Sequence, residues 1–297
     1  MPPTQAEKAA NLRAILARDA LVTMPCCFDA HSARLIEQEG FELSFLSGFA
    51  VSATRIGLPD MGFLSYGEIV DQARLVASST SVPIIGDGDT GYGNATTVRR
   101  TVDGFRSAGM AGIMIEDQVW PKRCGHVDGK AVVDRQEAFA RVAAAVRERD
   151  ENGDILVMAR TDALALHGMD EALHRAREFQ KIGADILFVE APDTEAALAE
   201  IPRRVPGIHM ANMLEGGATP ILPPADLDAM GYRIAAYPVT LLSAATSAMV
   251  TALKRLKAGK SATNLMGFPE LKRRIGFDAV LDAEAAAIDA ISGESEA

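Results

Sequence analysis

The chain has 297 residues, which is enough for one large α/β domain or for two smaller domains. Hydrophobic residues make up 48% of it and aromatic residues 5%, so we expect a large core that packs mainly through aliphatic side chains. Thirty Lys and Arg residues against forty Asp and Glu residues give a net charge of −10. Such an acidic balance argues against binding of nucleic acids or anionic membranes by bulk charge.

The sequence shows no pattern typical of a membrane helix, a signal peptide, a disulfide framework or a zinc site. No apolar run approaches the roughly 20 residues that a membrane helix needs, and the first residues lack the layout of a signal peptide. Cys26 and Cys27 are adjacent and Cys124 stands alone, which matches neither a disulfide framework nor a zinc site. We therefore expect a cytoplasmic protein that binds neither membranes nor nucleic acids.

Short β-branched and apolar runs alternate with segments of helical period. Several runs are apolar throughout, such as residues 186–189, which is typical of parallel strands that are buried on both faces. Eight strand–helix units match the roughly 250-residue size of a (β/α)8 barrel. The alternative is an open doubly wound sheet, which more often carries a Gly-rich nucleotide motif after its first strand. The predicted strands are Leu21–Pro25, Glu42–Ser47, Pro83–Asp87, Gly112–Asp117, Ile155–Arg160, Ile186–Glu190, His209–Met213 and Arg233–Tyr237.

The helical segments carry apolar residues at spacings of three and four. Residues 169–179 and 139–146 are the clearest cases, and each predicts an amphipathic helix. In the second segment we expect Arg141, Arg147 and Glu148 to point outward. Glycines occur where a helix is expected to end before the next strand, namely Gly40, Gly109, Gly183 and Gly231.

A single domain is expected to span residues 1–297. Residues 1–20 predict an amphipathic helix, the barrel occupies about residues 20–258, and residues 259–297 form a helical appendage. The predicted fold class is therefore α/β, a (β/α)8 TIM barrel with an N-terminal helix and a C-terminal helical extension. The apolar positions of the first helix are Ala9, Leu12, Ile15 and Leu16.

Residues with chemically active side chains follow almost every predicted strand. A single Asp after a strand is usually a helix cap. Six such strand ends would, however, meet at the carboxyl end of one barrel, where active sites of this fold lie. The sequence therefore predicts a site built from Ser47-Gly48, Asp87-Gly88-Asp89, Glu116-Asp117, Arg160-Thr161-Asp162, Glu190 and Asn212.

Three of these carboxylates, Asp87, Asp89 and Glu116, come from adjacent strands. Like charges that lie so close raise one another's pKa unless a cation neutralises them. Ligands that are all oxygen favour a hard divalent ion, so we expect Mg²⁺ or Mn²⁺ rather than zinc. Such an ion keeps several waters, which leaves room for a substrate oxygen.

A binding site for an organic anion is expected beside the metal. Arg160 offers a planar cation suited to a carboxylate. A hydroxyl and backbone N–H groups for the same carboxylate would come from Ser47, Gly48 and Phe49. Together with a metal, these groups describe a site for a small 2-oxo or 2-hydroxy acid.

The segment Lys122-Arg123-Cys124-Gly125-His126 follows the fourth strand in a loop. Three potentially cationic neighbours within two residues of Cys124 favour its thiolate form. The alternative is a small buried thiol, but the polar, glycine-containing setting favours a reactive cysteine.

This five-residue segment resembles the catalytic-loop signature of the isocitrate lyase and phosphoenolpyruvate mutase superfamily. The resemblance continues in chain order up to about residue 258. It implies a (β/α)8 barrel, commonly a homotetramer made of two dimers in which the last barrel helix is swapped between subunits. The other matching segments are Gly57–Asp60, Asp87–Asn94, Ile115–Gln118, Ala159–Ala163 and Ala211–Gly217.

The resemblance also implies a role for each matching residue. Cys124 would protonate a departing carbanion as a general acid, and the loop over residues 119–132 would open and close over the site. Asp87 would bind Mg²⁺ directly, whereas the other carboxylates would hold its waters. Three sets follow: Asp60, Asp87, Asp89 and Glu116 for the metal; Ser47, Gly48, Phe49, Arg160, Glu190 and Asn212 for the substrate; and Cys124, Arg160, Asp60, Glu116 and His126 for catalysis.

The chemistry that the resemblance implies agrees with the site expected from the residues. The leading hypothesis is a Mg²⁺-dependent lyase that cleaves a 2-hydroxydicarboxylate, of the alkylmalate or 2-methylisocitrate type, into a 2-oxo acid and a carboxylic acid. The alternatives are a P–C bond mutase or hydrolase, an oxaloacetate hydrolase or decarboxylase, and, from another class, a catalytically silent binding module. Phe45 departs from the lyases of the family, which carry Tyr at this position, so either the base or the substrate is expected to differ.

Overall fold

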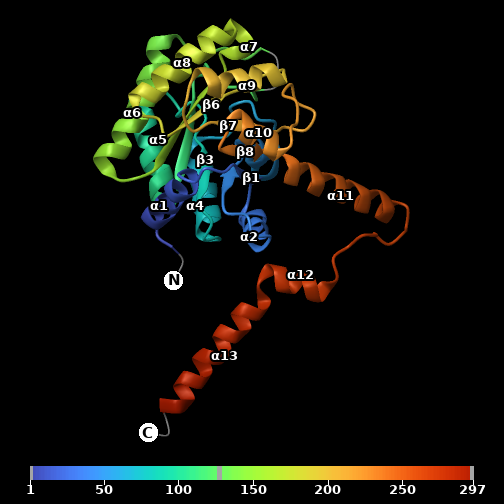
Figure 1. The fold of residues 1–297 in the computed structure, drawn as a ribbon. Helices are drawn as coiled ribbons and strands as arrows, with labels where there is room; N and C mark the ends of the chain where they lie inside the picture. Colours follow the sequence, from blue (N-terminus) through green and yellow to red (C-terminus); the bar gives the residue numbers. More distant parts are fainter. Residues whose placement is uncertain (1–2, 126–128, 295–297) are drawn as a thin grey trace. The chain divides into compact units, whose positions relative to one another are not determined.

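The computed structural model of the protein describes residues 3–125 and 129–294. Within these residues, eight parallel strands are surrounded by helices (Figure 1). All eight predicted strands are confirmed, with small differences at their ends. They are β1 (Val22–Cys27), β2 (Ser44–Leu46), β3 (Ile84–Asp87), β4 (Gly112–Glu116), β5 (Leu156–Thr161), β6 (Ile186–Val189), β7 (Met210–Asn212) and β8 (Ile234–Tyr237).

The strands pair in chain order and close on themselves. β1 pairs with both β2 and β8, and β8 pairs with β7. An isolated bridge between Leu187 of β6 and His209, just before β7, joins the two remaining edges. The predicted barrel is thus confirmed over an open sheet. Because parallel strands all end at one rim, the residues that follow β2 to β7 meet at the carboxyl end of the barrel.

Helices follow the strands and cover the outside of the barrel. Their inward faces and the outward faces of the strands share one apolar layer, to which Phe105, Phe179 and Val157 contribute. The predicted helix ends are confirmed, since Gly183 and Gly231 end their helices with φ of 112° and 98°. The helices are α2 (Ala30–Gln38), α3 (Gly48–Val51), the π-helix η1 (Ser52–Ile56), α4 (Tyr66–Ser78), α5 (Ala95–Ser107), α6 (Arg135–Asn152), α7 (Leu164–His167), α8 (Met169–Ile182), α9 (Glu195–Arg204) and α10 (Pro224–Met230).

Two charged residues of α6 are buried, and the expectation that they point outward is wrong. Arg141 is 4% exposed and donates to the carbonyl of Gln118 at 2.8 Å. Glu148 accepts from Nε of Arg99 in α5 at 2.7 Å. Because α6 packs against both α5 and α8, neighbouring helices cover the flanks of its apolar stripe, and the charges on these flanks are paired. Arg147 is exposed, as predicted.

The helix α1 (Gln5–Leu16) closes the amino end of the barrel. Thr4 and Glu7 form a capping box at its N-terminus. Its apolar residues pack against side chains that point into the barrel from the strands. The predicted N-terminal helix is confirmed, with Ala9, Leu12, Ile15 and Leu16 buried.

The chain divides into two compact units, one over residues 1–243 and one over residues 244–297. The division falls within α11 (Thr240–Lys257), and α12 (Phe268–Ile275) and α13 (Phe277–Glu294) belong to the second unit. None of the described helices is long and apolar enough to cross a bilayer. The second unit exposes large apolar side chains, among them Leu253, Leu256, Leu265, Phe268, Val280 and Ile288.

Candidate active site

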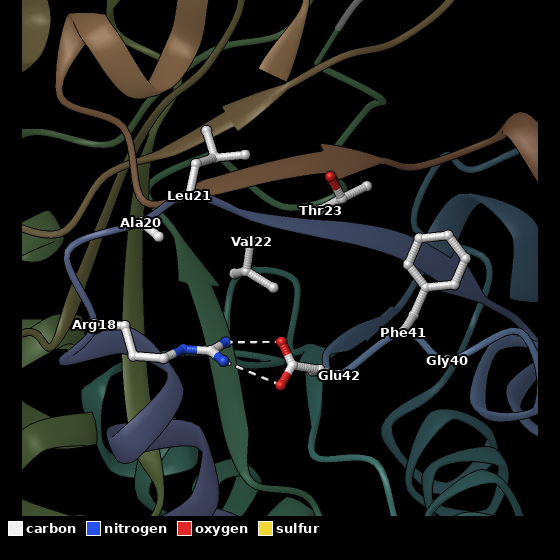
Figure 2. A pocket seen from close by; sticks show the side chains of 8 residues that line it. All are labelled: Arg18, Ala20, Leu21, Val22, Thr23, Gly40, Phe41 and Glu42. Atoms are coloured by element: carbon white, nitrogen blue, oxygen red, sulfur yellow. Dashed lines mark hydrogen bonds and ion pairs between the residues drawn. The ribbon is translucent and has the colours of Figure 1, made fainter. Parts of the chain in front are cut away.

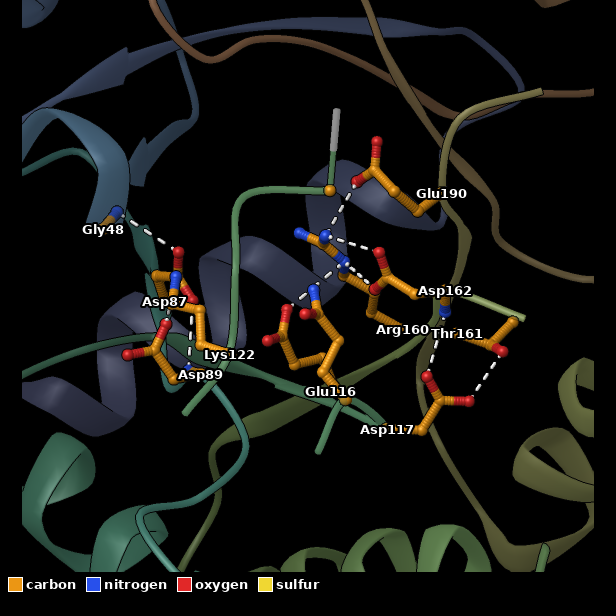
Figure 3. Close-up of polar contacts among 12 residues, drawn as sticks. Gly48, Asp87, Asp89, Glu116, Asp117, Lys122, Arg160, Thr161, Asp162 and Glu190 are labelled. Carbon is orange, nitrogen blue, oxygen red and sulfur yellow. Dashed lines mark hydrogen bonds and ion pairs between the residues drawn. The ribbon is translucent and has the colours of Figure 1, made fainter. Parts of the chain in front are cut away.

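The turn after β2 lies against the end of β3 at the carboxyl rim (Figure 3). Ser47 caps α3 by accepting from the N–H of Ala50 at 3.3 Å. The N–H of Gly48 donates to Oδ2 of Asp87, the last residue of β3, at 3.2 Å. A Cβ on Gly48 would lie 2.6 Å from that oxygen, so only glycine lets the backbone approach Asp87 so closely.

The turn after β3 holds Asp89 beside Asp87. Asp89 has a left-handed backbone conformation with φ of 48°, and its N–H donates to Oδ1 of Asp87 at 3.1 Å. The carbonyl of Asp89 accepts from the N–H of Glu116 at 2.9 Å, and its carboxylate accepts from the hydroxyl of Tyr92 at 3.0 Å. The ends of β3 and β4 are thus tied together, and their carboxylates share one part of the rim.

The ammonium group of Lys122, a residue of the loop after β4, lies among the same carboxylates. Nζ is 2.6 Å from Oδ1 of Asp60 and 2.7 Å from Oδ1 of Asp89, and the lysine side chain is 4% exposed. The N–H of Cys124 donates to the carbonyl of Asp60 at 3.2 Å, which joins the loop to Asp60 a second time. We call Asp60, Asp87, Asp89 and Lys122 the carboxylate–lysine group.

Burial and like charge act together on this group. Burial is the largest cause at Asp89, and with Asp87 and Asp60 nearby it outweighs the effect of Lys122 and raises the pKa of Asp89 to about 7. At Lys122 the surrounding carboxylates outweigh burial and hold the pKa of the ammonium well above its usual value. Lys122 therefore stays charged, and three carboxyl groups share its one ammonium group.

Arg160, near the end of β5, is surrounded by three carboxylates. Its Nε donates to Asp162 at 2.8 Å and lies 3.4 Å from Glu116, and its Nη2 lies 3.3 Å from Glu190. The guanidinium carbon is 5.2 Å from the ring centroid of Phe188, a favourable position for a cation. We call Arg160, Glu116, Asp162 and Glu190 the arginine group (Figure 3).

Two carboxylates of the arginine group differ in their acidity. Burial raises the pKa of Glu116 well above its usual value, although Arg160 and Lys122 oppose this effect. At Asp162 the balance is reversed, because Arg160 and Lys130 outweigh burial and lower the pKa to about 2. Asp162 is therefore a fixed negative partner for Arg160, whereas Glu116 is the more basic carboxylate.

The loop after β4 packs directly onto the arginine group. A Cβ on Gly125 would lie 2.4 Å from Nη2 of Arg160 and 2.7 Å from Cγ of Glu190. The ammonium group of Lys130 donates to the carbonyl of Gly125 at 2.6 Å and to Oδ1 of Asp162 at 3.0 Å. The loop thus reaches the site through a residue that has no side chain, and a lysine holds it there.

Most of the residues predicted for the site lie together at this rim. Nδ2 of Asn212, at the end of β7, donates to Oε1 of Glu190 at 3.4 Å. This contact brings together the two residues that are expected to contact the remainder of the substrate. Phe49 is 38% exposed and Cys124 is partly buried. His126 lies outside the described residues.

Two lysines of the site were not predicted from the sequence. Lys122 was considered only as a cationic neighbour of Cys124, and its distance from Asp60 in the sequence hides their pairing. Asp162 was predicted at the rim with the end of its strand, but its pairing with Arg160 was not. Lys130 gives no signal of its own, because only the barrel brings it to Asp162.

The carboxylates at the rim suit Mg²⁺ or Mn²⁺. They offer only oxygen ligands, which hard divalent cations prefer. Oε1 of Glu116 is buried and has no hydrogen-bond partner among the described residues, so it is an acceptor that a cation or its waters would satisfy. Within the described ranges no three His, Cys, Asp or Glu side chains form a ready-made cage. Mg²⁺ does not need one, because it usually binds one or two carboxylates and keeps its waters.

These features define a (β/α)8 barrel with buried charged groups gathered at its carboxyl rim, which is where active sites of this fold lie. The sequence pattern of the phosphoenolpyruvate phosphomutase family matches residues 12–257. The chain belongs to this family, within the isocitrate lyase and phosphoenolpyruvate mutase superfamily.

Relatives with different reactions resemble the chain over nearly its whole length. It is 40% identical over 280 residues to 2,3-dimethylmalate lyase from Eubacterium barkeri, which covers 93% of this chain and 96% of that protein. Oxaloacetate acetylhydrolase, solved with the inhibitor 3,3-difluorooxalacetate, superposes with a TM-score of 0.92 at 31% identity, covering 96% of this chain and 98% of that one. Phosphonopyruvate hydrolase, solved with oxalate and Mg²⁺, superposes with a TM-score of 0.83 at 29% identity, covering 94% and 98%.

Proposed function

We propose that the protein is a Mg²⁺-dependent lyase that cleaves the C2–C3 bond of a malate-like 2-hydroxydicarboxylate into a 2-oxo acid and a carboxylic acid. The arginine group carries this proposal, because a buried guanidinium there lies beneath the cysteine loop and beside carboxylates suited to a divalent ion. The similarity to 2,3-dimethylmalate lyase favours an alkylmalate as substrate, with 2-methylisocitrate as the related candidate.

Arg160 binds one carboxylate of the substrate. Asp162 accepts from its Nε at 2.8 Å and from its Nη2 at 3.1 Å, which fixes the plane of the guanidinium before the substrate arrives. A planar donor held in this way recognises a carboxylate with a defined orientation. The remaining contacts are assigned to Ser47, Gly48 and Phe49 on the same carboxylate and to Glu190 and Asn212 on the rest of the substrate.

Two residues of the chain move the protons. As the C2–C3 bond breaks, its electron pair stays on C3 and C2 becomes a carbonyl. We assign the proton of the C2 hydroxyl to Glu116, because its Oε1 is buried without a hydrogen-bond partner among the described residues and its Oε2 lies 3.4 Å from Nε of Arg160. The thiol of Cys124 donates its proton to C3, and after product release the proton on Glu116 returns to the thiolate through water. Glu116 thus supplies the basic group that Phe45 lacks.

Asp87 and the carboxylates around it would hold Mg²⁺ or Mn²⁺, whose charge stabilises the oxyanion that develops at C2. The magnesium in the related phosphonopyruvate hydrolase supports this assignment. Treatment with EDTA followed by gel filtration should abolish activity, and added Mg²⁺ should restore it. Full activity after this treatment would contradict the metal requirement.

A substrate panel tests the function. It contains 2-alkylmalates, 2-methylisocitrate, oxaloacetate and phosphonopyruvate, and the release of the 2-oxo acid or oxalate is followed for each. We expect the highest kcat/KM for an alkylmalate. The likeness to oxaloacetate acetylhydrolase makes oxaloacetate hydrolysis the second candidate. Preference for phosphonopyruvate would indicate P–C chemistry, and no turnover of any compound would indicate a binding module.

We also propose that the enzyme is a homotetramer, made of two dimers that swap a helix. The apolar side chains that the second unit exposes support this proposal, because a monomer seldom leaves so many in water. Light scattering at micromolar concentration should give about four times the 31.5 kDa monomer mass. A mass near that of the monomer would contradict it.

The cytoplasm is the compartment that we propose for the enzyme. Cys26, Cys27 and Cys124 form no disulfide bond, as expected where thiols are kept reduced. Cell fractionation should recover the protein with cytoplasmic markers, and recovery with an oxidising compartment would contradict this placement.

A further inference from the structure

The carboxylate–lysine group already contains a cation. Nζ of Lys122 lies within 2.7 Å of a carboxylate oxygen of both Asp60 and Asp89, and its side chain is 4% exposed. Figure 3 shows the lysine side chain next to Asp87 and Asp89. Its charge offsets part of the charge of these carboxylates, which burial would otherwise make costly.

A divalent ion bound by the same carboxylates would meet this ammonium group at close range. Two cations a few ångströms apart repel each other strongly where water is excluded. Oδ1 of Asp60 and Oδ1 of Asp89 also cannot serve both cations fully. The two cations would therefore compete for these carboxylates.

We propose that Lys122 is an internal counter-cation of the metal site, which neutralises Asp60 and Asp89 until a divalent ion binds and then moves away. The inference rests on the proposed metal site and adds to it a residue that lowers metal affinity. It also links the metal to the loop, because Lys122 is two residues from Cys124 and anchors this end of the loop. The other end has its own anchor, Lys130 on Asp162.

Direct metal binding tests the proposal without relying on catalysis. Mn²⁺ binding to the full chain is measured by calorimetry at about pH 8, where protons compete weakly for the carboxylates. Lys122→Met should bind Mn²⁺ at least about tenfold more tightly than the wild type, because the competing charge is gone. Lys130→Met is the matched control: it removes an ammonium group from the same loop but from a different carboxylate, and its Kd should stay within about threefold of the wild type.

A second measurement follows the loop. Because Cys26 and Cys27 are buried, alkylation of the native protein reports mainly on Cys124. Mn²⁺ should speed this alkylation in the wild type, where Lys122 leaves its partners, and should change it much less in Lys122→Met. Should Lys122→Met fold poorly, Lys122→Gln removes the same charge and keeps a hydrogen-bond donor for the carboxylates.

The outcomes separate this proposal from the proposed function. An unchanged or weaker Mn²⁺ affinity in both Lys122 variants, beside normal binding by the wild type, would overturn the counter-cation role alone. The lysine would then hold the carboxylates in place for the metal rather than compete with it. Failure of the wild type to bind Mn²⁺ or Mg²⁺ would overturn the metal site and this inference together.

Discussion

The two ends of the barrel differ in how they place apolar and charged side chains. At the amino end, α1 fills the barrel with aliphatic side chains such as Leu12, which is 0% exposed. Most charges there lie at the surface, as in the pair of Arg18 and Glu42, whose side chains are 45% and 56% exposed. A buried exception is Lys8 of α1, whose ammonium group donates to the backbone carbonyls of Ala77 and Thr80 rather than to a carboxylate. At the carboxyl end the charges are buried, and the side chains of Lys122 and Asp60 are 4% and 8% exposed.

This difference separates stability from function within one fold. Burying aliphatic surface stabilises a protein by about 25 cal/mol per Å². A buried ion pair contributes little, because the cost of removing both charges from water offsets their attraction. The amino end therefore stabilises a carboxyl end whose charges are positioned before the substrate arrives. Substitutions at the two ends should therefore have different consequences for stability and for turnover.

The largest effect is expected from Cys124→Ser at the carboxyl end. Turnover should fall by roughly 10²–10⁴-fold, which is the usual contribution of a positioned general acid, because a serine hydroxyl is too weak an acid to replace the thiol. KM should change much less, since Arg160 and its carboxylates are intact, and the free energy of unfolding should be nearly unchanged. Steady-state kinetics and urea unfolding check both points. Turnover within about threefold of the wild type would remove the acid role from Cys124.

At the amino end, Leu12→Ala should produce the opposite result. Removing this fully buried side chain from the interior of the barrel should lower the free energy of unfolding by about 2–5 kcal/mol, while kcat of the folded enzyme stays close to that of the wild type. Asn11→Ala is the matched control, because it changes the exposed neighbouring position of the same helix. A large loss of kcat in Leu12→Ala under conditions where the variant is folded would show that the two ends are coupled.

The two ends also differ in how far the sequence predicts them. The strands and α1 were predictable, because burial on both faces or on one helical stripe leaves an apolar pattern that residues such as Leu12 follow. The strand-end carboxylates were predictable because a parallel barrel brings all strand ends to one rim. The pairing of Lys122 with Asp60 was not, since the two residues are far apart in the sequence and a lysine in a loop is usually exposed. Arg141 escaped prediction for a similar reason, because its burial depends on neighbours that the period of its own helix does not reveal.

A pH effect on stability is expected from His209, which is 0% exposed just before β7. Its Nε2 lies 2.5 Å from the carbonyl of Val205, and its Nδ1 has no hydrogen-bond partner among the described residues. Burial lowers the pKa of His209 more than this contact raises it. The unfolded chain therefore binds the proton more readily than the folded one, and stability should fall as the pH drops below the ordinary histidine pKa, by at most about 1.4 kcal/mol per pH unit.

The variant His209→Phe isolates this effect, because it keeps a ring of similar shape and does not titrate. Urea unfolding of both proteins between about pH 7.5 and 5.5 should show the wild type losing stability relative to the variant as the pH falls. A difference that stays constant, or that shifts in favour of the wild type at low pH, would mean that His209 is protonated in the folded protein.

The smallest effect is expected from Arg18→Ala at the amino end. Figure 2 shows Arg18 and Glu42 facing each other beside a cavity of about 270 Å³, and their closest atoms are 2.9 Å apart. Both side chains are largely in water, so the attraction is screened and ordering them costs entropy. The free energy of unfolding should change by less than about 1 kcal/mol, and the change should shrink further in high salt. Glu42→Gln should give the same result, with normal kcat in both variants. A loss above about 2 kcal/mol would mean that the amino end also depends on charge, and the contrast between the two ends would then fail.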